Sequence, residues 1–132
     1  MRVLALDYGS ARCGCAVSDP TGVLATPVEP VLRPATRAGR SRLRALLVET
    51  GAERIVVGLP LTLAGGESAQ TAEAREFAAR LERDLPVPVE LYDERLTTRQ
   101  AARFGGRASE DSRAAAILLE NWLAAREAGG AG

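Results

Sequence analysis

The stretch Arg2-Val3-Leu4-Ala5-Leu6-Asp7-Tyr8-Gly9-Ser10 decides the fold of this chain. Its apolar run is typical of a buried strand, and the last residue of this strand is the acidic Asp7. Asp7 lies in phase with Val3 and Ala5 on the two-residue repeat, and Gly9 then lets a bulky ligand approach the backbone. The alternative is a plain hairpin turn, but a turn needs no Asp at the end of a core run. Because a lone carboxylate is costly to bury without a cation, the pattern favours a metal-binding Asp7.

The composition narrows the chemistry that such a site could use. The chain has 132 residues, enough for one domain with a real core, and its 17 basic and 17 acidic residues balance. Every basic residue is Arg, and there is no His. The absence of His excludes a His general base and a His-ligated zinc site. Hydrolytic chemistry would therefore have to use carboxylates and a hard cation.

Cys13 and Cys15 stand two residues apart and are expected on one face of the second strand. This spacing is too close for an ordinary strand disulfide, and further ligands for a closed zinc site are missing. We interpret both as buried apolar residues in a reducing compartment. The sequence begins directly with a strand, and no apolar segment approaches the roughly 20 residues of a membrane span. We therefore expect a soluble, cytoplasmic protein without membrane contacts.

The residue pattern predicts an α/β fold in the order β-β-β-α-β-α-β-α-α. Strands are expected at residues 2–7, 12–19, 23–31, 54–60 and 86–92, and helices at residues 36–50, 68–83 and 109–127. A further short helix is expected to start at a capping box of Thr97 and Gln100 and to be broken by Gly105-Gly106. Pro27 and Pro30 place the third strand at a sheet edge. Asp19 is interpreted as a turn former rather than a ligand. The result is a five-stranded mixed sheet with helices on both faces, one domain over residues 1–128 and a flexible tail over 129–132.

Three acidic positions are expected to converge in this fold. Asp7 ends the first strand and the pair Asp93-Glu94 ends the fifth, at the edge where open α/β sheets bind ligands. Asp111 begins the last helix and shares one helical face with Trp122, the only Trp. The alternative role for Asp111 is purely structural: an acid in the first turn stabilises a helix through its dipole. An acid that faces outward would provide the same stabilisation. A face that carries the only Trp should be buried, so we expect Asp111 to point toward the sheet.

Carboxylates without His or Lys suit Mg²⁺ or Mn²⁺, which activate water and stabilise in-line displacement at phosphorus. A run of arginines without an intervening acid lies between Val31 and Val48: Arg33, Arg37, Arg40, Arg42 and Arg44. Such a run is usually a solvated helix face. Beside an acidic metal site it could also bind the phosphates of nucleic acid, and Arg37, Arg40 and Arg44 are the candidates for this contact.

The ordered motifs of the chain resemble those of the YqgF (RuvX) family of bacterial nucleases. The opening motif is Asp7-Tyr8-Gly9 with Arg12, Gly14, Ala16, Ser18 and Asp19. The later motifs are Gly58-Leu59-Pro60-Leu61, Asp93-Glu94-Arg95-Leu96-Thr97-Thr98, and Asp111-Ser112 with Ala114-Ala115 and Ile117-Leu118. The resemblance covers nearly the whole chain.

This resemblance implies a ribonuclease H-like fold related to the Holliday-junction resolvase RuvC. It further implies a metal-dependent nuclease with a role in maturing the 5′ end of pre-16S ribosomal RNA. The family's acidic site falls on Asp7, the pair Asp93-Glu94 and Asp111, with Asp7, Glu94 and Asp111 as the preferred metal ligands. Arg12 and Arg95, which belong to the same motifs, join the candidate contacts to nucleic acid.

The chain departs from the family pattern at two places and from RuvC-like enzymes at a third. Thr62-Leu63-Ala64-Gly65 stands where the family usually has Asn-Met-Asp-Gly, and the usual Lys-rich segment before Asp111 is missing. RuvC-like enzymes also carry an acid on the fourth strand, where this chain has Val57-Gly58. The acid after the fifth strand must substitute, and we favour Glu94 over Asp93.

Other functions fit parts of the same pattern. Phosphotransferases of the actin and sugar-kinase type also open with an Asp-x-Gly hairpin, but they need two lobes to enclose a nucleotide, and 132 residues supply one. A Holliday-junction resolvase acting on four-way DNA, or a non-catalytic nucleic-acid-binding module of ribosome assembly, would keep the fold. The expected partners are therefore a structured RNA precursor, branched DNA or a ribosome precursor.

Overall fold

The computed structural model describes residues 1–96 and 109–129 and has the predicted order of elements. The strands are β1 (Val3–Asp7), β2 (Arg12–Ser18), β3 (Ala25–Leu32), β4 (Arg54–Leu59) and β5 (Val89–Asp93). The helices are α1 (Arg37–Thr50), α2 (Ala69–Asp84) and α3 (Glu110–Gly129), and the 3₁₀ turn η1 (Glu94–Leu96) follows β5. The short helix expected between the Thr97/Gln100 capping box and Gly105-Gly106 lies outside the described residues.

The five strands form one mixed sheet in the order β3-β2-β1-β4-β5. β1 pairs antiparallel with β2 and parallel with β4, and β4 pairs parallel with β5. β3 is an edge strand, as its prolines predicted. It begins two residues later than expected, because the Asp19 carboxylate accepts hydrogen bonds from the backbone N–H groups of Val23 and Leu24. Asp19 is thus a turn former, and these bonds, with one from Thr21, lower its pKa to about 2.

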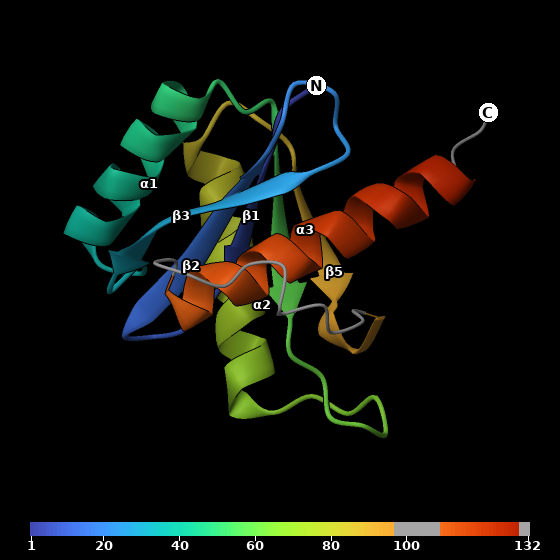
Figure 1. Cartoon of the computed structure of the whole chain (residues 1–132). Helices are drawn as coiled ribbons and strands as arrows, with labels where there is room; N and C mark the ends of the chain where they lie inside the picture. The colour runs from blue at the N-terminus through green and yellow to red at the C-terminus, as the bar shows by residue number, and fades with distance from the viewer. Residues whose placement is uncertain (97–108, 130–132) are drawn as a thin grey trace.

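Helices cover both faces of the sheet, as predicted. One core joins Leu4 and Leu6 of β1 to the apolar stripes of α1 and α2. The other joins Val3 and Ala5 of the same strand to α3, which Figure 1 shows crossing one face of the sheet. The two-residue repeat of β1 therefore divides its side chains between the two cores. Cys13 and Cys15 are free and fully buried in the first core, in agreement with the interpretation of both as apolar residues.

The helix ends follow the expected local chemistry. Thr36 caps α1 by accepting a hydrogen bond from Gly39 N–H, and Gly51 ends the helix in the left-handed conformation with φ 68°. A capping box of Ser68 and Thr71 starts α2. Trp122 of α3 is buried, and its indole N–H donates to Glu90 Oε2 of β5 at 3.0 Å. The caps define where α1 and α2 begin, and the indole bond ties α3 to β5.

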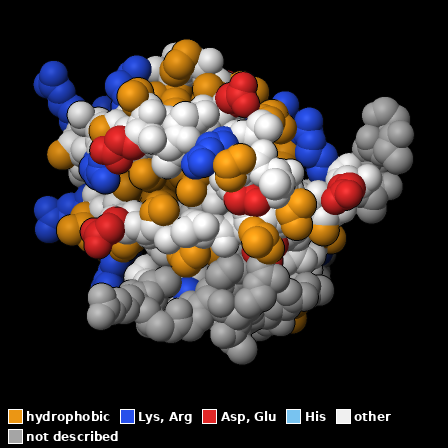
Figure 2. Space-filling model, turned by 45° about the horizontal axis from the view of Figure 1, so that its top comes forward, with side chains coloured by type: hydrophobic (Ala, Val, Ile, Leu, Met, Phe, Trp, Pro, Cys, Tyr) orange, Lys and Arg blue, Asp and Glu red, His pale blue; other side chains and the backbone are white. Residues whose placement is uncertain are grey.

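The surface agrees with the balanced charge of the sequence. The face drawn in Figure 2 carries arginine and acidic side chains interspersed with apolar and neutral atoms, so this face has no patch of one sign. Among the described residues, no helix is long and apolar enough to cross a membrane.

Candidate active site

Asp7 is the last residue of β1 and faces the α3 side of the sheet. It shares this side with Val3 and Ala5, whose side chains belong to the core beneath α3. Its neighbour across the antiparallel pair is Gly14 of β2. The Asp7 side chain is only partly accessible to solvent. The carboxylate predicted from the first strand thus lies at the carboxyl end of the central strand β1, partly under the last helix.

Glu94 reaches Asp7 because Gly58 leaves the space between them open. Glu94 lies in η1, directly after β5, and its side chain folds back over β4. A Cβ atom on Gly58 would stand only 2.6 Å from Glu94 Oε1. The carboxyl groups of Asp7 and Glu94 share a hydrogen bond. Glu94 therefore occupies the place above β4 where the sequence offers no acid on the strand itself.

Asp111 is held near Asp7 by an unusually close contact between α3 and β2. A Cβ atom on Gly14 would stand 1.9 Å from the Asp111 carbonyl oxygen, so only glycine permits this approach. Ser112 fastens the same turn: its buried Oγ accepts from Cys15 N–H at 3.2 Å and donates to the Val28 carbonyl at 2.5 Å. The negative charge of Asp111 acts on Asp7. The first turn of α3 is thus locked beside the end of β1.

These contacts identify Gly14, Gly58 and Ser112 as positioning residues that the sequence reasoning missed. For Ser112 a signal was available, because it stands four and seven residues before the buried Ala116 and Leu119 and so lies on the buried face of α3. A polar residue on such a face needs a hydrogen-bond partner. The two glycines gave no signal beyond their place in motifs.

The pair Asp93-Glu94 divides into two roles in the structure. Asp93 turns away from Asp7 and binds Arg95, with 2.6 Å between Asp93 Oδ2 and Arg95 Nη2. Hydrogen bonds from the Arg95 side chain and backbone hold the pKa of Asp93 below its ordinary value. Arg95 also lies against the loop in which the chain departs from the family, within 3.5 Å of the Leu63 carbonyl oxygen. The geometry thus favours Glu94 over Asp93 as the partner of Asp7.

The electrostatics of the site strongly raise the pKa of Asp7. The pKa of Asp7 is raised from 3.8 to about 8, first by burial, then by the hydrogen bond to Glu94, and then by the charges of Glu94 and Asp111. Among the described residues, Asp7 forms no salt bridge with any arginine. At neutral pH Asp7 is therefore mostly protonated in the absence of metal.

The chemistry of these donors fits a hard divalent cation, which takes oxygen ligands and relieves repulsion among carboxylates. Among the described residues, no group of three or more His, Cys, Asp or Glu side chains is close enough to hold a metal ion in this conformation. The carboxyl groups of Asp7 and Glu94 are hydrogen-bonded to each other instead. Cation binding would require Asp7 to lose its proton and the Asp111 side chain to approach the other two.

The candidate arginines do not all lie beside the carboxylates. Arg12 is exposed at the start of β2, and Arg95 is exposed in η1, so both lie at the edge of the sheet where Asp7 ends β1. Arg37, Arg40 and Arg44 lie on α1, which packs on the opposite face of the sheet from Asp7. The expectation that this run lies next to the acidic site therefore has no support in the geometry.

Comparisons with known proteins give one consistent family. The family model described as "RuvX: Holliday junction resolvase" matches residues 1–125. A relative from Mycobacterium tuberculosis is 48% identical over 143 aligned positions, which cover 99% of this chain and 83% of the relative. A relative from Koribacter versatilis is 46% identical over 102 positions, covering 77% of this chain and 67% of the relative. Both carry the name "Putative pre-16S rRNA nuclease".

Solved structures confirm the expected RuvC-like, ribonuclease H-like fold. RuvC from Thermus thermophilus matches with a TM-score of 0.63 at 20% identity, covering 97% of both chains. The same protein in complex with a Holliday junction substrate matches with a TM-score of 0.64 at 17% identity, covering 96% of both. A fowlpox virus resolvase matches with a TM-score of 0.51 at 9% identity, covering 98% of both.

Proposed function

Because this chain belongs to the RuvX family, we propose that it is a metal-dependent nuclease that matures the 5′ end of pre-16S ribosomal RNA. The family match and the names of the relatives support hydrolysis of phosphodiester bonds. The observation that carries the proposal is the partly buried Asp7, whose carboxyl group is hydrogen-bonded to that of Glu94 and whose pKa is raised further by the charge of Asp111. A partly buried cluster of carboxylates with one strongly raised pKa is characteristic of a functional site.

In this proposal Asp7, Glu94 and Asp111 hold Mg²⁺ or Mn²⁺ at the edge of the sheet. A cation bound there supplies an activated water and stabilises the charge that develops during in-line displacement. The protein places the three carboxylates through the end of β1, the turn η1 over Gly58, and the start of α3 on Gly14. The structure brings Asp7 and Glu94 together, and the Asp111 side chain would have to approach them when the cation binds.

Arg12 and Arg95 are the arginines placed to contact the substrate near the carboxylates. Both are exposed at the same edge of the sheet. Arg95 is oriented by Asp93, which binds its backbone N–H at 2.9 Å and its guanidinium at 2.6 Å. A guanidinium held in this way is prearranged for a phosphate. Asp93 therefore acts in the proposal as a positioning residue for Arg95.

Branched DNA is the second candidate substrate. It is favoured by the fold likeness to a resolvase that has been solved in complex with a Holliday junction. The acidic edge of the sheet suits any phosphodiester, because the metal site contacts the phosphate and not the base. A third candidate is a non-catalytic module of ribosome assembly in the cytoplasm, which would bind RNA precursors without cleaving them.

One assay distinguishes the three candidate functions: rRNA nuclease, junction resolvase and non-catalytic assembly module. The wild type is incubated with Mn²⁺ and either a pre-16S 5′-end RNA fragment or a four-way DNA junction, each with a labelled strand. We expect cleavage of the RNA at a defined position and weaker or no cleavage of the junction. Glu110→Gln is the matched control, since Glu110 is an exposed acid beside Asp111. Resolution of the junction with intact RNA would favour the resolvase, and binding of RNA without cleavage would favour the assembly module.

A further inference from the structure

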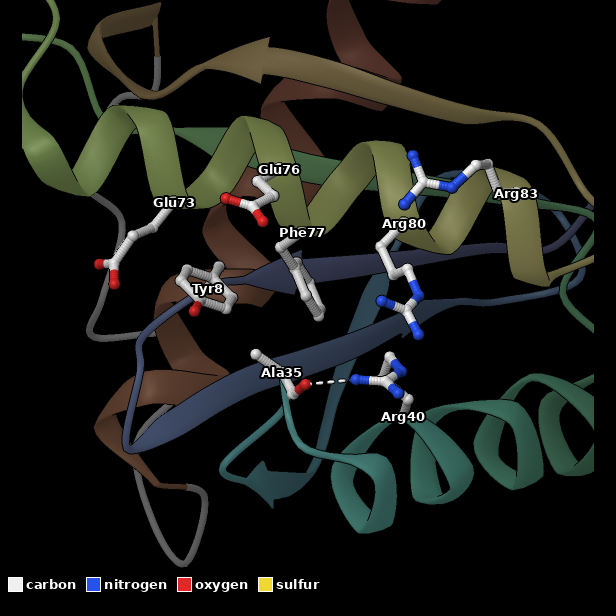
Figure 3. A pocket seen from close by; sticks show the side chains of 8 residues that line it. All are labelled: Tyr8, Ala35, Arg40, Glu73, Glu76, Phe77, Arg80 and Arg83. Atoms are coloured by element: carbon white, nitrogen blue, oxygen red, sulfur yellow. Dashed lines mark hydrogen bonds between the residues drawn. The ribbon is translucent and has the colours of Figure 1, made fainter.

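A groove lined by arginines lies between α1 and α2, on the face of the sheet opposite Asp7. It consists of two adjoining cavities of about 220 and 250 Å³ that share Arg40. The first cavity also contains Tyr8 and Phe77, and Figure 3 shows Arg40 of α1 and Arg80 of α2 extending toward each other beside them. The second cavity continues along α1 to Leu85, just after the end of α2.

Two helices contribute five arginines to this groove. They are Arg37, Arg40 and Arg44 of α1 and Arg80 and Arg83 of α2. The sequence shows only the first three as a run, since the other two come from a helix about 40 residues later. Both helices cover the same face of the sheet, and this placement brings the two sets together.

Asp84 arranges three of these arginines. Its carboxylate oxygen Oδ2 lies 3.0 Å from Arg80 Nε and 3.9 Å from Arg40 Nε. Its carbonyl oxygen accepts a hydrogen bond from Arg44 Nη2 at 2.6 Å. The carboxylate and the carbonyl of Asp84 together cannot satisfy all the donors of these three guanidinium groups, each of which carries five N–H bonds. The arginines are therefore oriented and still have donors left for an anion.

Arg37 and Arg83 are the most available of the five. Both are exposed, and neither forms a salt bridge with any described residue. By contrast, Arg42 and Arg75 lie on the same two helices but outside the groove, and each is paired with a glutamate. The groove thus holds the unpaired positive charge of these helices.

Two of the three acidic residues that line the groove lie at its Tyr8 end. Besides Asp84, the lining carboxylates are Glu73 and Glu76, which belong to the cavity that contains Tyr8. Tyr8 packs against Phe77 with 4.6 Å between ring centroids, which gives this end an apolar floor. Such an end repels phosphate but suits an uncharged base with N–H donors at its edge.

The position of Tyr8 connects the groove to the carboxylates. Tyr8 directly follows Asp7, and the two residues fall on opposite faces of the sheet at the same edge. A nucleic-acid strand that passes the carboxylates can therefore continue around this edge into the groove. Cavities of 220 and 250 Å³ lie below the roughly 300–1,000 Å³ of pockets that enclose drug-sized ligands. They suit single nucleotides of one strand and not a duplex.

We propose that the α1–α2 groove binds the single-stranded segment that flanks the cleaved phosphodiester, with phosphates on the arginines and a base at Tyr8. This inference rests on the proposed nuclease function for its choice of ligand. It assigns Arg80 and Arg83 a contact with nucleic acid, and it gives Arg37, Arg40 and Arg44 a role on the face away from the carboxylates.

The test is binding of a fluorescein-labelled 16-nucleotide oligoadenylate RNA, measured by anisotropy in EDTA at several salt concentrations. The variant is Arg37→Ala/Arg83→Ala, because both side chains are exposed and unpaired. The matched control is Arg42→Ala/Arg75→Ala, with the same change in charge on the same helices. Each phosphate contact with a single strand contributes about 0.7 to the log–log salt slope. We expect the variant to lose about 1.4 from the slope and about 25-fold in affinity at 0.1 M salt.

The control should bind like the wild type, and a 16-base-pair RNA duplex should bind more weakly than the single strand. An unchanged slope in the variant, an equal loss in the control, or preference for the duplex would overturn the inference. Because EDTA prevents metal-dependent cleavage, this result does not depend on catalysis. A wild type that binds through the groove but cleaves no substrate would contradict the proposed function and leave the groove intact.

Discussion

Replacement of Asp7 by Asn should stabilise the metal-free protein, and the gain should grow with pH. The pKa of Asp7 is about 8 in the folded protein against an ordinary value of 3.8. The folded state therefore keeps a proton that the unfolded state loses above pH 4, and stability falls as pH rises from about 4 to about 8. Each pKa unit corresponds to about 1.4 kcal/mol, so the cost is on the order of 4 kcal/mol at pH 7.

Asn removes this cost because it is neutral at every pH and can still donate a hydrogen bond to Glu94. The free energy of unfolding is measured by urea titration in EDTA at pH 4.5, 6, 7 and 8.5 for the wild type, Asp7→Asn and Glu110→Gln. We expect the wild type and the control to lose stability across this range, and the difference between Asp7→Asn and the wild type to widen from less than about 1 kcal/mol to several. Parallel pH profiles for all three proteins would refute the assignment of the raised pKa to Asp7.

Three further substitutions test how the site is built. Asp111→Asn should leave metal-free stability unchanged or higher, because it removes a like charge, but it should reduce the thermal stabilisation by Mn²⁺ and abolish cleavage. The control Glu110→Gln should change neither the Mn²⁺ stabilisation nor cleavage. A normal Mn²⁺ shift of the melting temperature in Asp111→Asn would remove Asp111 from the site. Gly58→Ala should displace the Glu94 side chain, which a Cβ atom would approach to 2.6 Å, and weaken Mn²⁺ binding at least tenfold by calorimetry; unchanged affinity would show that Glu94 is not a ligand. Ser112→Ala should cost about 1–3 kcal/mol in urea titration by leaving two buried backbone groups without their partner, and a loss below about 0.5 kcal/mol would show that Ser112 does not hold α3 on the sheet.

The sequence predicted the elements of this fold well, because each carries a local signal. The two-residue repeat of β1 identifies both a buried strand and the face of Asp7, and the stripe that ends in Trp122 identifies the buried face of α3. Asp19 lies in a turn motif of the sequence, and in the structure its carboxylate forms the turn by accepting a hydrogen bond from Val23 N–H. These inferences depend on residues close together in the chain.

The arrangement of the site could not be predicted in the same way. Gly14 and Gly58 matter for the space they leave to Asp111 and Glu94, which are distant in sequence, so their role appears only when the elements are packed. The choice between Asp93 and Glu94 depends on the 3₁₀ turn η1, which directs one carboxylate to Arg95 and the other to Asp7.

The arginines of α1 illustrate a second limit. Their spacing along the helix gives no information about which face of the sheet the helix covers, and the expectation that they lie beside the carboxylates assumed the wrong face. Their partners Arg80 and Arg83 belong to another helix and share no motif with them. Long-range packing, and not local pattern, makes this groove.

The central claim is that Asp7, with Glu94 and Asp111, holds the cation that the cleavage of nucleic acid requires. The most direct measurement is cleavage of a pre-16S 5′-end RNA fragment by the wild type and by Asp7→Asn, each with Mn²⁺ and with excess EDTA, after melting curves have shown that both are folded. We predict cleavage by the wild type with Mn²⁺ and none in the other three reactions. Cleavage by Asp7→Asn, or by the wild type in EDTA, would contradict the account.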